Sequence, residues 1–162
     1  MTAVISIGTN STRLLLVEFG RHRARVVARS SIGTRVGEGL NERGQLGELP
    51  MRRTLDAVRE HVRAIAGRSG TVAVIATSAL RRANNAAELA DRVREITGTG
   101  LRILTGDEEA RYSFAGARAA VGTNGRLGVI DTGGGSTEYA VGAGGRVERA
   151  VSCEVGAVRL TE

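Results

Sequence analysis

The stretch that decides the fold is VIDTGGGST at residues 129–137, because it repeats VISIGTNST at residues 4–12. At a constant offset of 125 positions, the two stretches share Val, Ile, Gly, Ser and Thr, and the match resumes at Gly20-Arg21 and Gly145-Arg146. In each copy an apolar run leads into a polar turn and a second apolar run, which predicts strand, turn and strand. This repeat predicts two structurally related lobes.

Between the two copies, strand patterns alternate with helical ones. Apolar residues at helical spacing predict helices at residues 51–65, 89–96 and 110–121, and short apolar runs predict strands at 72–76 and 101–104. The polar, Gly-rich segment 32–50 is expected to be a loop. This alternation predicts an α/β fold with a mixed or parallel sheet covered by helices.

The two copies differ in the length of chain after them. Helices and further strands come after the first copy, whereas little more than one strand comes after the second. We therefore expect a complete first lobe at residues 1–122 and the opening strands of a second lobe at 123–162, a lobe that we interpret as truncated. Strand edges exposed by such a truncation predict self-association.

Composition narrows the class of protein. Aromatic residues make up 2% of the chain, so the core must be aliphatic. All 23 basic residues are Arg and the net charge is +6, which favours a polyanionic partner. Nucleic acid is not expected, because no aromatic residues alternate with the arginines.

The cysteine content and hydropathy bear on the location of the protein. The single cysteine, Cys153, is expected to be buried and suggests a reducing, cytoplasmic setting. No apolar run is long enough to cross a membrane.

The glycine turn of the second copy is the sharpest candidate site. Three glycines, Gly133, Gly134 and Gly135, would let the backbone approach a ligand and take positive φ angles. Their amides could form an anion-binding nest, to which Ser136 adds a hydroxyl. Asp131, at the end of the preceding strand, could hold a divalent cation. The alternative is an ordinary hairpin turn, although tight hairpins need only one or two glycines.

The first copy contains the same kind of polar turn between two predicted strands, with fewer glycines. Asn10, Ser11 and Thr12 are common turn residues, and they become a candidate phosphate site only as the partner of the second turn. Arg81 and Arg82 come after a buried strand, at the edge where α/β sheets bind ligands. Either arginine could clamp a phosphate, and at least one is expected to be an ordinary surface residue.

Three carboxylates open the helix that is predicted from residue 106 onward. Asp107 and Glu108 are explained by helix capping and by the helix dipole. Those roles do not require Glu109, which could accept a proton from water beside a bound phosphate. The interpretation that Glu109 is only a surface residue stays open. His61, in the first long helix, is expected to be exposed and has no metal-ligand neighbour.

Five motifs occur together in this chain. They are IGTNSTR at residues 7–13, ATSALR at 76–81, TGDEEAR at 105–111, VIDTGGGSTE at 129–138 and VGAVRLTE at 155–162. Taken in this order and spacing, they resemble the exopolyphosphatase/guanosine-pentaphosphate phosphatase family. The resemblance implies the actin-like, hexokinase/Hsp70 (ribonuclease H-like) fold. It also implies release of a terminal phosphate from polyphosphate or guanosine pentaphosphate, with Mg²⁺ or another divalent cation.

The resemblance also implies roles for single residues. Glu109 matches the general base, and Asp131 and Glu138 match carboxylates near the metal. The phosphate-binding positions match Asn10, Ser11, Thr12, Arg81, Gly133, Gly134, Gly135 and Ser136. One position departs from the pattern: the family usually has Asp where this chain has Ser6. A hydroxyl cannot supply the missing negative charge.

These residues leave three functional hypotheses. The first is a cytoplasmic phosphoanhydride hydrolase that acts on polyphosphate, guanosine pentaphosphate or both. The second is a truncated, catalytically weak or inactive relative that binds polyphosphate or a nucleotide, which Ser6 favours. The third is a sugar or acetate kinase of the same superfamily, which would need an adenosine-binding segment that this sequence does not contain.

Overall fold

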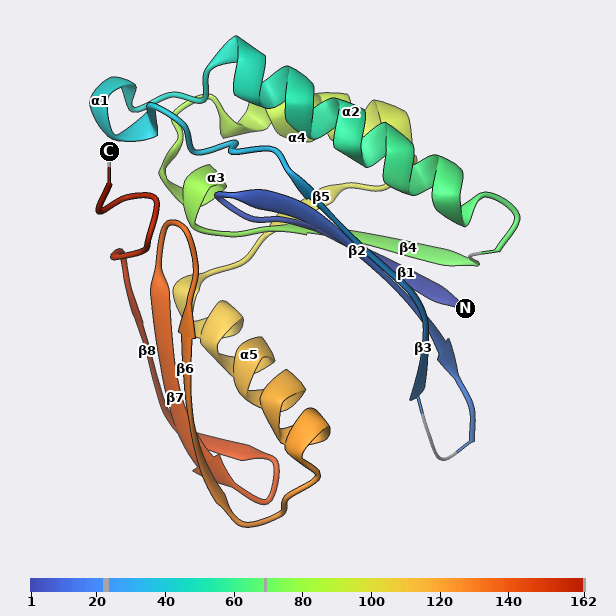
Figure 1. The fold of residues 1–162 in the computed structure, drawn as a ribbon, viewed down its shortest axis with the longest axis vertical. Helices are drawn as coiled ribbons and strands as arrows, with labels where there is room; N and C mark the ends of the chain where they lie inside the picture. Colours follow the sequence, from blue (N-terminus) through green and yellow to red (C-terminus); the bar gives the residue numbers. More distant parts are fainter. Residues whose placement is uncertain (22–23, 69, 162) are drawn as a thin grey trace. The chain divides into compact units, whose positions relative to one another are not determined.

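The computed structural model describes residues 1–21, 24–68 and 70–161. Its internal contacts divide the chain into two compact units, Met1–Ile103 and Leu104–Glu162. Each unit contains one sheet with its own helical cover (Figure 1). Within the described ranges, no helix combines the length and the apolar character that crossing a bilayer requires.

Unit 1 contains a five-stranded mixed sheet in the order β3-β2-β1-β4-β5 (Figure 1). Its strands are β1 (Thr2–Ile7), β2 (Ser11–Phe19), β3 (Ala24–Gly33), β4 (Thr71–Ala76) and β5 (Leu101–Ile103). Its helices are α1 (Leu40–Arg43), α2 (Glu48–Ile65), α3 (Ser78–Arg82) and α4 (Ala86–Thr97). The first three strands form an antiparallel meander, and β4 runs parallel to both β1 and β5. These parallel pairs need the helical crossovers that α2 and α4 provide.

The core of unit 1 lies between one face of this sheet and the helices α2 and α4 (Figure 1). Ala3, Ile5 and Ile7 alternate along β1 onto this face and are all 0% exposed. They share one cluster with the apolar stripes of the two helices, which include Leu55, Val58, Leu89 and Val93. The cluster contains no aromatic side chain among the described residues, as the composition predicts.

Unit 2 is a three-stranded antiparallel sheet with one helix packed on it (Figure 1). Its elements are α5 (Gly106–Val121), β6 (Arg126–Thr132), β7 (Thr137–Ala143) and β8 (Arg146–Cys153). The strands lie in the order β6-β7-β8, and the small core is formed by Ala110 and Phe114 of α5 with Ala140 of β7.

The boundary between the units lies between Ile103 and Leu104, whereas the sequence placed it after residue 122. The difference is due to α5, which packs on β6, β7 and β8 and therefore belongs to the second sheet. An amphipathic pattern shows that one side of a helix is buried, but it does not identify the sheet that buries it.

The internal repeat is present in the strand pairing. Ile5 pairs with Leu14 across β1 and β2, and 125 residues later Ile130 pairs with Tyr139 across β6 and β7. All six cross-strand pairs of β1 and β2 recur at this offset. The two lobes that the sequence predicted therefore begin with the same hairpin in the same register.

Three local expectations need correction. The segment 32–50 contains α1 and the start of α2, and Pro50 fits there because a first helical turn tolerates proline. His61 is 1% exposed, and its Nε2 lies 3.2 Å from the carbonyl oxygen of Thr12. Cys153 is exposed, because it ends β8, an edge strand of the sheet.

Candidate functional site

The glycine turn of unit 2 is closed by its own backbone. The amide of Gly133 donates to the carbonyl oxygen of Ser136 over 2.9 Å, and the Ser136 side chain is buried. Within the part of the chain that the structure describes, the amides of Gly134 and Gly135 donate to no protein acceptor. Two neighbouring amides without a protein acceptor are what an anion-binding nest requires.

The segment after β8 holds this turn in place. The amide of Ala157 donates to the carbonyl oxygen of Gly133 over 3.0 Å, and the amide of Val158 donates to that of Gly134 over 2.9 Å. A Cβ atom on Gly156 would lie only 2.5 Å from the carbonyl carbon of Gly134. Close approach of two backbone segments therefore explains the glycine at position 156.

The glycines of the turn itself do not use positive φ. None of Gly133, Gly134 and Gly135 lies in the left-handed region, although the sequence allowed for it. The backbone of Gly134 lies close to Gly156, whose own Cβ would come within 2.5 Å of the Gly134 carbonyl carbon.

The first turn, in unit 1, is built in the same way. The amide of Gly8 donates to the carbonyl oxygen of Ser11 over 3.0 Å. The segment after β3 then holds the turn, because the amide of Gly37 donates to the carbonyl oxygen of Thr9 over 3.1 Å. A Cβ atom on Gly37 would lie 2.5 Å from Cγ2 of Thr9. Gly37 and Gly156 thus serve the same purpose in the two units.

The sequence analysis gave neither glycine a structural role, although Gly156 lies in the motif at residues 155–162 and a signal was present at both positions. Each comes directly after a valine and lies shortly after the third strand of its repeat, as Val36-Gly37 and Val155-Gly156. Because the segments after the third strand differ in length between the copies, the constant offset of 125 does not align them.

The predicted phosphate-binding residues of unit 1 differ in their surroundings. Asn10 is exposed, and the Oγ of Ser11 accepts a hydrogen bond from Nε of Arg13 over 3.1 Å. The hydroxyl of Thr12 is fully buried and lies 3.1 Å from the hydroxyl of Thr34. This hydroxyl therefore serves to fasten the turn to the segment after β3, and it does not face solvent.

The helix that carries Arg81 begins beside the first turn. The amide of Thr77 donates to the carbonyl oxygen of Ile7 over 3.3 Å, because β1 and β4 run in parallel and end together. Arg81 and the residues of the first turn therefore lie at the same edge of the sheet, the edge at which α/β sheets bind ligands. Arg81 is half-buried and Arg82 donates to Oδ1 of Asn41 over 2.8 Å.

The two predicted metal carboxylates are direct neighbours in unit 2. Asp131 and Glu138 are cross-strand partners on β6 and β7. The hydroxyl of Ser113 donates to Oδ2 of Asp131 over 2.5 Å, and the hydroxyl of Ser152 donates to Oε1 of Glu138 over 2.7 Å. Asp131 is exposed and Glu138 is buried, so the pair is open to solvent at one end.

The start of α5 is well defined. The hydroxyl of Thr105 accepts from the amide of Glu108, and the Glu108 carboxylate accepts from the amide of Thr105, so the predicted capping box is confirmed. Asp107 instead forms an ion pair with Arg111 over 2.6 Å. The hydrogen bond and the charge of Asp107 raise the pKa of Arg111 above its ordinary value.

Glu109 lies on the side of α5 that contacts the sheet near Asp131 and Glu138. One turn before it, a Cβ atom on Gly106 would lie 2.4 Å from Cβ of Ser152, and one turn after it Ser113 contacts Asp131. Residues three and four positions apart share one face of a helix, so Glu109 lies between these two contacts. Glu109 therefore lies on the side of α5 from which Gly106 and Ser113 contact the sheet.

The residues present can be compared with what a divalent cation needs. Among the described residues, no group of three or more His, Cys, Asp or Glu side chains is arranged to hold a metal ion. Mg²⁺ is commonly bound through one or two carboxylates together with substrate phosphates and water. The Asp131–Glu138 pair fits that mode and does not fit a site in which protein ligands surround the ion.

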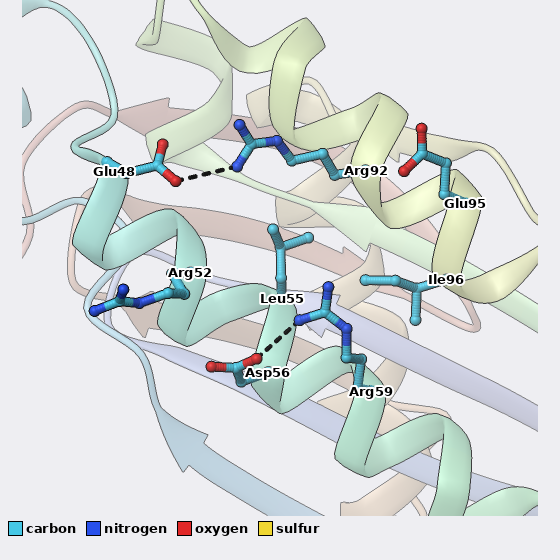
Figure 2. A pocket seen from close by; sticks show the side chains of 8 residues that line it. All are labelled: Glu48, Arg52, Leu55, Asp56, Arg59, Arg92, Glu95 and Ile96. Atoms are coloured by element: carbon cyan, nitrogen blue, oxygen red, sulfur yellow. Dashed lines mark hydrogen bonds and ion pairs between the residues drawn. The ribbon is translucent and has the colours of Figure 1, made fainter.

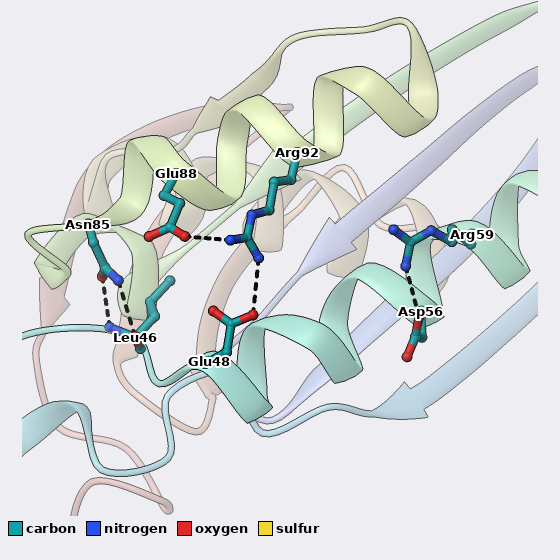
Figure 3. A network of polar contacts seen from close by, with 7 residues as sticks. All are labelled: Leu46, Glu48, Asp56, Arg59, Asn85, Glu88 and Arg92. Carbon is teal, nitrogen blue, oxygen red and sulfur yellow. Dashed lines mark hydrogen bonds and ion pairs between the residues drawn. The ribbon is translucent and has the colours of Figure 1, made fainter.

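Unit 1 has a pocket between α2 and α4 (Figure 2). It has a volume of about 440 Å³ and is lined by Leu55, Ile96, three arginines and three carboxylates. Arg59 pairs with Asp56 over 2.8 Å, and Arg92 lies between Glu48 and Glu88 (Figure 3). The Arg92–Glu48 pair joins the two helices, whereas the Arg59–Asp56 and Arg92–Glu88 pairs each lie within one helix. Because the lining carries three arginines and three carboxylates, its charges balance.

A second contact joins the same two helices near their starts (Figure 3). The side-chain oxygen of Asn85 accepts from the amide of Leu46 over 2.8 Å, and its amide group donates to the Leu46 carbonyl oxygen over 3.1 Å. This pair ties the residues before α2 to the beginning of α4. It supports the helical layer that covers the sheet.

Comparison with known proteins identifies the family. A model of the Ppx/GppA phosphatase family matches residues 16–162. The chain belongs to this family. Ppx/GppA relatives include exopolyphosphatase 2 of Mycobacterium tuberculosis, 34% identical over 99% of this chain and 53% of the relative. A guanosine-5'-triphosphate,3'-diphosphate pyrophosphatase of Aliivibrio fischeri is 30% identical over 100% of this chain and 33% of the relative.

Solved structures support the same assignment. The crystal structure of the Aquifex aeolicus Ppx/GppA family member matches with a TM-score of 0.85 and 32% identity, over 99% of this chain and 53% of that one. The fold is actin-like: MreB5 of Spiroplasma citri matches with a TM-score of 0.51 at 16% identity, which concerns the fold alone. This Ppx/GppA chain spans about a third to a half of the length of its relatives.

Proposed function

We propose that the chain contributes the phosphate-binding and catalytic residues of a cytoplasmic phosphoanhydride hydrolase. Its substrates would be inorganic polyphosphate, guanosine pentaphosphate or both, and its reaction would be the release of a terminal phosphate by attack of water. Two relatives are named for these two classes of substrate. Membership of a phosphatase family over residues 16–162 supports the reaction class.

In this proposal Glu109 accepts a proton from the attacking water. Its neighbours in the first turn have structural roles, because Asp107 pairs with Arg111 and Glu108 closes the capping box. A general base must lie within hydrogen-bond reach of the water that it activates. The contacts of Gly106 and Ser113 with the sheet support that position for Glu109.

The phosphate oxygens would be bound mainly by backbone amides. The available donors in unit 2 are the amides of Gly134 and Gly135, in a turn that Gly133 and Ser136 close. In unit 1, the proposal assigns substrate contacts to Asn10, Ser11 and Arg81. Thr12 would contribute by holding the turn in place, because its hydroxyl contacts Thr34 and it pairs with both neighbouring strands. Donors held in place before the substrate arrives stabilise charge that develops in the transition state.

Asp131 and Glu138 are the residues that would hold Mg²⁺. When bound there, the cation would neutralise charge on the phosphoryl oxygens. The hydroxyls of Ser113 and Ser152 orient the two carboxylates through hydrogen bonds.

The observation that carries this proposal is the duplicated turn. Gly8 to Ser11 and Gly133 to Ser136 form the same closing hydrogen bond, and each turn is held by a later segment through a glycine without room for a side chain. A flexible hairpin needs no such support. A turn held in place by its own backbone, with amides that have no protein acceptor, is useful where a phosphate must be held in one position.

The proposal can be tested by measuring phosphate release from long-chain polyphosphate with Mg²⁺. Glu109→Gln should lower the rate about 100-fold or more if Glu109 is the base. The matched control is Asp107→Asn, which changes a carboxylate in the same helical turn and should alter the rate by no more than about twofold. Equal rates for the chain and Glu109→Gln would contradict the assignment of the base.

A binding-only protein is the second candidate, and Ser6 favours it. Ser6 occupies in β1 the position that Asp131 occupies in β6, and it adds no negative charge for a cation. Retention of polyphosphate without release of phosphate, by the chain and by Glu109→Gln alike, would identify this function.

A further inference from the structure

The backbone of Arg35 has a conformation that suits glycine better than arginine. Among the described residues, Arg35 is the only one other than glycine with a positive φ, which is 48°. The nearest glycines, Gly33 and Gly37, lie two residues to either side, and neither has a positive φ. A side chain in this region costs conformational energy that glycine avoids. Such a residue persists where the surrounding structure holds it, and strained positions of this kind cluster at ligand-binding sites.

The first turn holds Arg35 in this conformation. The carbonyl oxygen of Asn10 accepts hydrogen bonds from the amide of Thr34 over 3.1 Å and from the amide of Arg35 over 3.0 Å. The carbonyl oxygen of Arg35 accepts from the amide of Glu38 over 3.0 Å. Thr34 and Val36 are 0% exposed, whereas Arg35 between them is exposed. The backbone of Arg35 is therefore fixed beside Asn10, and its side chain extends into solvent there.

Positive charge gathers around this position. The pKa of Glu38 is lowered first by the hydrogen bond and the charge of Arg53. The charges of Arg35 and Arg43 lower it further, so both guanidinium groups lie near this carboxylate. Glu38 pairs with Arg53, and within the described ranges the guanidinium group of Arg35 forms no hydrogen bond or ion pair. An excess of positive charge beside the first turn attracts a ligand with several negative charges.

We propose that Arg35 binds a phosphate group adjacent to the one held by the first turn, so that unit 1 selects ligands with at least two linked phosphates. This inference rests on the proposed function, in which Asn10 and Ser11 contact the substrate. A guanidinium group binds phosphate oxygens through two parallel hydrogen bonds. The strained backbone fixes the starting point of this side chain against Asn10, and this determines which phosphate of a chain it reaches. Polyphosphate and guanosine pentaphosphate both contain linked phosphates, so Arg35 would serve either substrate.

The competing interpretation is that Arg35 is purely structural, through its charge near Glu38 or through the stem of its side chain. Under that interpretation, removing the side chain should lower the unfolding free energy. Under the proposal, Arg35→Gly should maintain or raise it, because glycine adopts a positive φ without strain. The loss would instead appear in the binding of linked phosphates. A substitution that keeps the fold stable and weakens the ligand identifies a residue whose role is binding.

The test measures binding of tripolyphosphate and of orthophosphate to the full chain by isothermal titration calorimetry. Omitting the divalent cation that the proposed reaction needs allows binding to be measured without phosphate release. Arg35→Gln keeps the strained backbone but removes the charge, and it should weaken tripolyphosphate binding about tenfold. Orthophosphate binding should change by no more than about twofold at physiological ionic strength, because the first turn holds that phosphate and more distant charges are screened.

Arg52→Gln is the matched control for the loss of charge. Arg52 is an exposed arginine of α2 that forms no ion pair in the part of the chain that the structure describes, and its substitution should leave both affinities unchanged. Urea unfolding of Arg35→Gly completes the set. Its midpoint should equal or exceed that of the unmodified chain, while tripolyphosphate binding falls as in Arg35→Gln.

Four results would overturn the inference and leave the proposed function intact. They are unchanged tripolyphosphate binding in both Arg35 variants, equal weakening of orthophosphate, equal weakening by Arg52→Gln, and a lower urea midpoint for Arg35→Gly. If the unmodified chain bound neither ligand, the proposed function would fail together with the inference.

Discussion

Asp131 lies directly opposite Glu138 across β6 and β7, on the side of the sheet that α5 covers. The equivalent pair in unit 1, at the same offset of 125 residues, is Ser6 and Arg13. The repeat therefore keeps the backbone geometry of the hairpin while the charges of the two sites differ. Unit 2 has two neighbouring carboxylates where unit 1 has a hydroxyl and a guanidinium group.

This difference leads to a prediction for Ser6. Ser6→Asp introduces the carboxylate found at the equivalent position of unit 2, and it should increase Mg²⁺-dependent phosphate release about tenfold or more. The control is Ser31→Asp, because Ser31 also lies opposite Arg13 but on the far strand, β3. A similar increase in both variants would show that charge near Arg13 matters and position 6 does not.

Gly156 should not tolerate a side chain. Gly156→Ala places a methyl group 2.5 Å from the backbone of Gly134, so the turn must shift, at a cost of about 1–3 kcal/mol in unfolding free energy. The same substitution should weaken binding of phosphate or polyphosphate, because it shifts the amides of the turn. Urea unfolding and a binding titration measure the two effects.

Gly116 provides the matched control for this substitution. It lies inside α5 with no heavy atom within 4 Å of a Cβ placed on it. Gly116→Ala should raise stability by about 0.5–1 kcal/mol, because alanine loses less backbone entropy in a helix. If both substitutions had the same effect, close packing at Gly156 would not be the reason for the glycine.

The ion pair between Glu38 and Arg53 should make the stability of unit 1 depend on acid pH. Arg53 donates to Glu38 over 2.5 Å, and this hydrogen bond, followed by the charge of Arg53, lowers the pKa of Glu38 below its ordinary value of 4.5. Because the pKa of Glu38 is lower in the folded state, the ion pair contributes fully to the unfolding free energy above about pH 4.5. This contribution is lost as the pH falls through the pKa of the folded state.

Glu38→Gln should therefore lower the stability of unit 1 at neutral pH, and its difference from the unmodified chain should vanish in acid. Urea unfolding at several pH values measures this. Glu42→Gln is the control, because Glu42 forms no ion pair within the described ranges. A difference that persists at the lowest pH would mean that the side chain acts through packing and not through its charge.

The helix α5 depends on its N-cap. Thr105→Ala removes the hydroxyl that accepts from the amide of Glu108, and it should reduce the unfolding free energy by about 1 kcal/mol. Thr105→Ser keeps the hydroxyl and should restore most of the loss. Because α5 carries Glu109, phosphate release should show the same order if that residue is the base. Thermal unfolding followed by circular dichroism measures the stability.

Much of this architecture could be predicted from the amino-acid sequence alone. The repeat at residues 4–12 and 129–137 predicted two related lobes, and the register of Ile5–Leu14 and Ile130–Tyr139 confirms the repeated hairpin. The capping pattern at Thr105 was confirmed as well. Such features depend on short stretches of chain, in which residue type and spacing decide the local conformation.

Other features depended on contacts between distant residues. The sequence placed α5 with the first lobe and left His61 exposed, whereas α5 packs on the second sheet and His61 is buried beside Thr12. The support of both turns by Gly37 and Gly156 was not foreseen for the same reason.

By itself, then, the sequence determined the family, the repeated strand–turn–strand unit and the residue types that can bind phosphate. The tertiary structure decided which sheet buries α5, which of the candidate hydroxyls are occupied, and that Asp131 and Glu138 are cross-strand partners on the side of the sheet that α5 covers. The physical reason is that periodicity describes which side of an element is apolar. The element that packs against this apolar side is decided only when the whole chain folds, by the fit of surfaces that are far apart in the sequence.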